Sequence, residues 1–92
     1  MSTSDLLRES HKKALDAREK MLDVRPKDAI PPLPDRILRD HTGCLHYFET
    51  AAHLYLMAAG AYSAGDLITG HTYELSAYQY LMLGQTCAEQ TA

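Results

Sequence analysis

The chain lacks tryptophan, has one phenylalanine among its 92 residues, and has no lysine or arginine in residues 41–92. All nine basic residues fall within residues 1–40, where they alternate with acidic residues. Phosphate binding requires basic side chains clustered on one face. A net charge of −3 without such a cluster argues against a nucleic-acid partner.

Long hydrophobic runs are also missing. The longest nearly apolar stretch, Leu54 to Tyr62, falls far short of the ~20 residues that span a bilayer. The N-terminal sequence MSTSDLLRESHKK has no apolar core of the kind found in signal peptides. We therefore expect a soluble, cytoplasmic protein with no membrane partner.

Motifs of catalysis are scarce as well. No serine or cysteine lies in a recognisable nucleophile motif, no glycine-rich loop suits a phosphate, and no helix presents two acids as a site. These absences favour a protein that is not an enzyme and needs no cofactor.

Residues 1–25 read as an amphipathic N-terminal helix, centred on 4–24. Its apolar or partly apolar positions follow helical spacing: Leu7, His11, Ala14, Leu15, Arg18, Met21 and Leu22. On the opposite face, Glu9–Lys13 and Asp16–Lys20 have the i,i+4 spacing of favourable ion pairs.

Residues 26–35 form a proline-rich linker, because four prolines fall between Pro26 and Pro34 and cannot continue a helix. PPLPDR, residues 31–36, matches the Pro-x-x-Pro-x-Arg pattern of polyproline ligands. We interpret it first as a stiff connector.

Residues 36–92 are predicted to form an antiparallel helical hairpin with helices at 36–64 and 67–90. The turn is SAGD, residues 63–66, in which Gly65 suits a left-handed helix end and Asp66 suits an N-cap. The first hairpin helix carries two apolar stripes, one through Leu38, His41, Leu45, Phe48, Ala52, Tyr55, Ala59 and Tyr62, the other through Tyr47, Ala51, Leu54, Ala58 and Ala61. The fold class is therefore all-α, a single domain with the N-terminal helix.

Two apolar stripes require burial on two sides. The N-terminal helix can cover one side, and a second copy would cover the other, giving a dimer with a four-helix core. The residues expected at this interface are Phe48, Tyr55, Tyr62, Tyr78 and Met82. We expect a non-enzymatic interaction module, acting as an adaptor, a regulatory subunit or a small inhibitor, that forms a homo-oligomer and binds a protein partner.

Three polar residues interrupt the apolar run: His46, Glu49 and His53. They lie within ~60° of one another around a helix, but the histidines are ~10.5 Å apart along its axis, which is too far for one ion. We interpret them as a polar seam at the edge of the core or at a dimer interface. The alternative is a metal-binding or metal-storage bundle that also uses His41 and His71.

The two cysteines occupy equivalent heights, because a hairpin that turns at 65/66 pairs positions summing to about 131, and Cys44 pairs with Cys87 on this count. The first interpretation is two unreactive thiols that fill space in the core. A disulfide and a contribution to a metal site remain alternatives.

The segment HYFETAAHLYLMAAGAYSAGDLITGH, residues 46–71, resembles small bacterial proteins built on a histidine-rich helical hairpin. Its Ala-Gly-Asp turn is also similar to tetratricopeptide-type hairpins, although the chain has no ~34-residue repeat. Neither resemblance implies an activity or catalytic residues.

Overall fold

A computed structural model describes residues 3–27, 29 and 44–91, and these residues form three helices and no strand. Helix α1 runs Thr3–Val24, α2 runs Cys44–Ser63 and α3 runs Leu67–Thr91. The all-α class is confirmed. Residues 36–43 of the expected first hairpin helix, most of the linker, the polyproline-like pattern and His41 lie outside the described residues.

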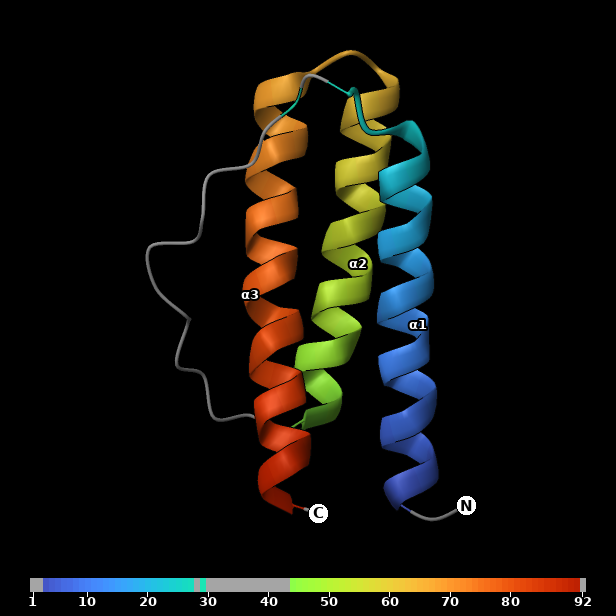
Figure 1. Ribbon diagram of the computed structural model, residues 1–92, viewed down its shortest axis with the longest axis vertical. Coiled ribbons are helices and arrows are strands. Elements are labelled where there is room, and N and C mark those ends of the chain that lie inside the picture. The colour runs from blue at the N-terminus through green and yellow to red at the C-terminus, as the bar shows by residue number, and fades with distance from the viewer. Residues whose placement is uncertain (1–2, 28, 30–43, 92) are drawn as a thin grey trace.

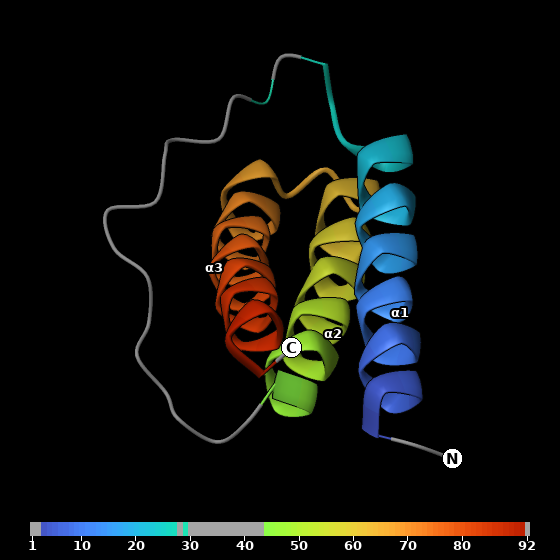
Figure 2. The same cartoon turned by 60° about the horizontal axis from the view of Figure 1, so that its bottom comes forward.

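The three helices pack side by side with α2 in the middle (Figures 1 and 2). α1 and α2 run in the same direction, and α3 returns antiparallel to both (Figure 1). The predicted hairpin is therefore present as α2 and α3. Among the described helices, none combines the length and the hydropathy that crossing a bilayer requires.

The hairpin turn has the expected glycine and cap. Gly65 has φ of +81°, and the backbone amides of Gly65 and Asp66 donate to the carbonyls of Tyr62 and Ala61 at 3.0 and 2.9 Å. These two bonds form a Schellman motif, which satisfies the last carbonyls of α2. The Asp66 carboxylate accepts from the Thr69 backbone amide at 3.1 Å, and hydrogen bonds from Thr69 lower the pKa of Asp66. One glycine and one aspartate thus end α2 and begin α3.

Aromatic rings of α2 pack on very small residues of α3. A Cβ added to Gly84 would lie 2.7 Å from the Phe48 ring, and one added to Gly70 would lie 2.6 Å from the Tyr62 ring. Ala77, fully buried, lies midway between the two glycines in sequence, as Tyr55 lies midway between the two rings. The backbone of α3 can approach α2 closely because these positions carry almost no side chain.

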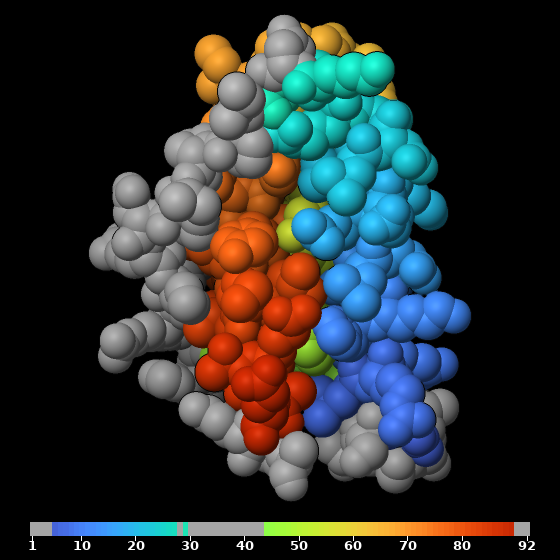
Figure 3. Space-filling model, in the orientation of Figure 1, coloured from blue at the N-terminus to red at the C-terminus, as the bar shows by residue number. Residues whose placement is uncertain are grey.

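α1 covers another side of α2 through small residues. Its buried positions recur at intervals of three and four: Ser10, Ala14, Ala17 and Met21. The three apolar residues among them join the same core as Phe48 and Tyr55. In Figure 3, α1 and α3 hide nearly all of α2 on this face of the molecule. The expectation that the N-terminal helix covers one side of the hairpin is confirmed.

The argument that a second copy must cover the other apolar stripe is wrong. Seven residues of α2 are buried within the single chain: Tyr47, Phe48, Ala51, Ala52, Tyr55, Ala58 and Tyr62. They come from both stripes, because α1 and α3 lie on different sides of the same helix. A second copy is therefore not needed to bury these seven residues.

Candidate interaction surface

One face of α2 remains exposed along the whole helix. Its exposed residues recur every three or four positions: His46, Glu49, His53, Leu56, Gly60 and Ser63. The three polar residues singled out in the sequence therefore share one face, which points to solvent. Leu56 is 48% exposed on the same face, so the face is polar with one large apolar side chain.

These side chains do not assemble into a metal centre. Within the described part of the chain, no three histidine, cysteine, aspartate or glutamate side chains come close enough together to hold an ion. His71 lies elsewhere, on α3, where its buried Nε2 has no hydrogen-bond partner among the described residues. The structure brings His46, Glu49 and His53 to one face of α2 but does not add a further ligand to them.

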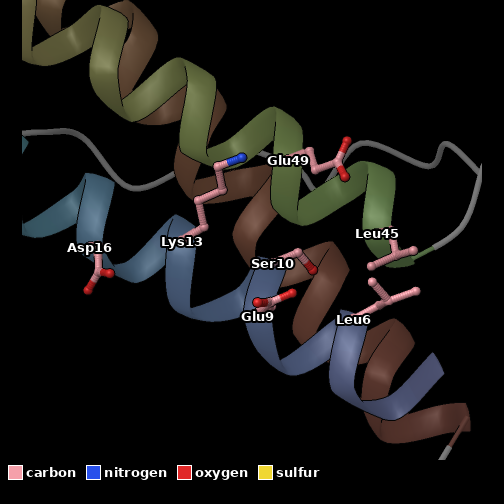
Figure 4. Close-up of a pocket in the computed structure, with 7 residues that line it drawn as sticks. All are labelled: Leu6, Glu9, Ser10, Lys13, Asp16, Leu45 and Glu49. Carbon is pink, nitrogen blue, oxygen red and sulfur yellow. The ribbon is translucent and has the colours of Figure 1, made fainter. Parts of the chain in front are cut away.

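A groove runs between α1 and α2 beside this exposed face (Figure 4). It consists of two hollows of about 450 and 470 Å³ that share Lys13, Asp16 and Glu49. We call their combined lining the α1–α2 groove: Leu6, Glu9, Ser10, Lys13, Asp16, Ala17 and Lys20 from α1, and Leu45, Glu49, Ala52, His53 and Leu56 from α2. Leucines lie toward its ends, and charged residues lie between them.

The charged residues of the groove are not paired as the sequence led us to expect. Neither Glu9–Lys13 nor Asp16–Lys20 comes within ion-pair distance in the described residues, so this prediction is wrong. Figure 4 shows Lys13 extending toward α2, whereas Asp16 points away from it. The charges of Glu9, Lys13, Asp16 and Lys20 are therefore available to an external partner.

Three of the five predicted interface residues are wrong. Phe48 and Tyr55 are each 1% exposed and Tyr62 is 4% exposed, because they fill the core that α2 shares with α1 and α3. Tyr78, at 39% exposed, and Met82, half-buried, lie on α3 and remain accessible. The a/d spacing correctly marked a packed face of α2, but the helices that pack there belong to the same chain.

Cys44 and Cys87 form a disulfide, with their Cα atoms 5.5 Å apart. The structure therefore has the disulfide alternative and not two separate thiols. It joins the first residue of α2 to the last turns of α3, at the end of the hairpin opposite the Gly65 turn. Disulfides persist in oxidising compartments and are rare in the cytoplasm, so this bond weighs against the cytoplasmic location expected from the sequence.

A polar cluster that the sequence did not reveal joins α2 and α3 to the residue that follows α1, near the hairpin turn. The Glu74 carboxylate on α3 accepts from Arg25 Nε at 2.8 Å and from the Tyr62 hydroxyl at 2.6 Å. Burial and the hydrogen bond to Glu74 raise the pKa of Tyr62 to about 12. Glu74 follows Gly70, on which the Tyr62 ring packs, by one helical turn. No sequence signal pointed to Arg25, which follows α1 directly.

A second contact that the sequence did not reveal joins α1 to the C-terminal half of α3. The His11 ring stacks on Phe48 with centroids 4.7 Å apart, and its Nε2 lies 3.2 Å from Gln85 Nε2. His11 therefore contributes to packing and not to the exposed histidine face of α2.

Comparisons of the chain with family models, with curated proteins and with solved structures find no match.

Proposed function

We propose that this protein is a non-enzymatic helical module that binds other protein chains and forms a homo-oligomer. The observation that carries the proposal is the α1–α2 groove, where leucines at the ends flank charged side chains with no ion-pair partner among the described residues. Grooves between helices commonly accept another helix, whose apolar side chains enter while polar ones meet the rim. An adaptor, a regulatory subunit and a small inhibitor all act in this way.

The rest of the surface supports the same proposal. Residues 41–92 contain no lysine or arginine, so exposed parts of α2 and α3 lack the cations that usually keep a helix face in water. Leu6 and Leu56, which line the groove, are 39% and 48% exposed in the single chain. A protein partner would bury this apolar surface.

Light scattering of the purified chain tests the proposal. We expect a mass that is a multiple of the 10.3 kDa chain at micromolar concentration. A single species of 10.3 kDa that persists when the concentration is raised tenfold would overturn the homo-oligomer.

A further inference from the structure

We propose that the α1–α2 groove binds the same groove of a second copy, antiparallel, about a two-fold axis that crosses α1 between Ala14 and Leu15 and crosses α2 at Ala51. The inference rests on the proposed function and names its partner and its contact surface. A two-fold interface uses the same patch on both copies, so the patch must complement itself when it is turned end to end. The charges and leucines of the groove meet this condition.

The charged residues of α1 complement themselves across such an axis. An axis between positions 14 and 15 pairs residues whose numbers sum to 29. Lys13 then faces Asp16 of the second copy, and Glu9 faces Lys20 of the second copy. Each contact occurs twice by symmetry, so four pairs of opposite charge form along α1.

The register is selective because neighbouring registers are repulsive. Sliding the copies by one helical turn in one direction places Glu9 opposite Asp16 of the second copy. Sliding them by one turn in the other direction places Lys13 opposite Lys20 of the second copy. Like charges brought together at an interface disfavour these two arrangements.

The exposed face of α2 complements itself at the same height. The His11 ring of α1 stacks on the Phe48 ring of α2 with centroids 4.7 Å apart, so the residues near Ala14 lie level with those near Ala51. An axis at position 51 pairs Glu49 with His53 of the second copy, and it brings Leu45 close to Leu56 of the second copy. An acid meets an imidazole, and an exposed leucine meets another leucine.

The groove residues are free to make these contacts. Glu9, Lys13, Asp16, Lys20 and Glu49 make no ion pair within the described part of the chain. Seven residues of the two stripes are already buried by α1 and α3, whereas Glu49, His53 and Leu56 on the groove side stay exposed, so this is the face of α2 left for a second copy. The dimer would place α1 on α1 and α2 on α2, each pair antiparallel.

A charge exchange on the full chain tests the inference. Lys13→Glu places a carboxylate opposite Asp16 of the second copy, and Asp16→Lys places an ammonium opposite Lys13 of the second copy. We expect each single substitution to raise the dimer dissociation constant by at least about tenfold, because every change acts at two symmetric contacts. The double substitution exchanges both signs and should return the constant to within about threefold of the parent.

Lys12→Glu is the matched control, because Lys12 is exposed on α1 but does not line the groove. Analytical ultracentrifugation measures the constants, and circular dichroism shows that each variant remains helical. Weakening by both single substitutions with recovery in the double would support the interface. A parent dimer that is indifferent to all of them, or a double variant as weak as the singles, would overturn this interface while leaving the proposed function. A monomeric parent would overturn both.

Discussion

The two sides of α2 are packed by different means. Toward α3, rings lie directly on glycines, with Phe48 on Gly84 and Tyr62 on Gly70. A disulfide closes one end of this interface and a Schellman turn closes the other. Toward α1, the buried residues are chiefly Ala14, Ala17 and Met21, and the interface opens into a charged groove.

The two sides of α2 therefore have different roles: one specifies the fold, and the other can recognise a partner. A ring that requires a glycine opposite it permits one register, because any larger side chain would collide with the ring. Small alanine side chains let α1 and α2 approach each other closely, but they do not fill the space beside the contact. The α3 side therefore determines how the hairpin closes, and the α1 side leaves the surface that another chain can use.

The largest expected effect comes from opening the disulfide. The bond links residues 43 positions apart, and the chain-entropy model gives about 4 kcal/mol of stabilisation for a loop of this length. The variant with Cys44→Ser and Cys87→Ser should lose about this much free energy of unfolding in urea. Dithiothreitol should destabilise the parent equally and leave the double variant unchanged. Equal stability of parent and variant would show that aromatic–glycine packing alone closes the hairpin.

A smaller loss should follow from filling the close contact at the same end. Gly84→Ala would place a Cβ 2.7 Å from the Phe48 ring, which must move away. Overpacking of this kind costs about 2 kcal/mol, more than the ~1 kcal/mol gained in helix propensity. Gly60→Ala is the control, because nothing lies within 4 Å of its added Cβ and the position is exposed. Gly60→Ala should stabilise the protein. Equal changes in the free energy of unfolding at the two glycines would refute the idea that the ring–glycine contacts with α3 fix the register of the hairpin.

Much of this hairpin could be predicted from the sequence, for local reasons. Gly65 and Asp66 encode the turn through backbone conformation and one side-chain hydrogen bond, and neither depends on distant residues. Once the turn is known, the numbering alone places Cys44 level with Cys87. The same register also places Gly84 opposite Phe48, so the aromatic–glycine contacts could also have been predicted from the sequence.

The assignment of surfaces was harder, because helical spacing shows that a face is packed but not what packs on it. Phe48, Tyr55 and Tyr62 have the spacing of an interface between subunits, yet they pack within one chain. The difference depends on where α1 lies after a long connection, and no local pattern determines that. The groove was missed for the same reason, since Lys13 and Glu49 become neighbours only when α1 and α2 lie in the same direction.

The smallest expected effect is a change in how the free energy of unfolding depends on alkaline pH. It concerns Tyr62, whose hydroxyl donates to the Glu74 carboxylate. Burial and the Glu74 hydrogen bond raise the pKa of Tyr62 to about 12, and burial raises that of Tyr55 to about 12, from an ordinary value of 10.0. The unfolded chain therefore loses these protons first as the pH rises. Their contribution to stability is fully present below about pH 10 and is lost as the pH rises toward about 12.

Tyr62→Phe should reduce the slope of unfolding free energy against pH by close to one proton at about pH 11. Tyr62→Phe also removes the hydrogen bond to Glu74. That loss lowers the free energy of unfolding by a constant amount, so it does not change the slope against pH. Tyr78→Phe, at a position 39% exposed, removes a tyrosine hydroxyl from outside the core and should change the slope less than Tyr62→Phe does. Urea unfolding followed by circular dichroism from about pH 9 to pH 11 measures all three slopes. Identical slopes in the three proteins would mean that burial and the hydrogen bond to Glu74 do not hold Tyr62 protonated in the folded chain.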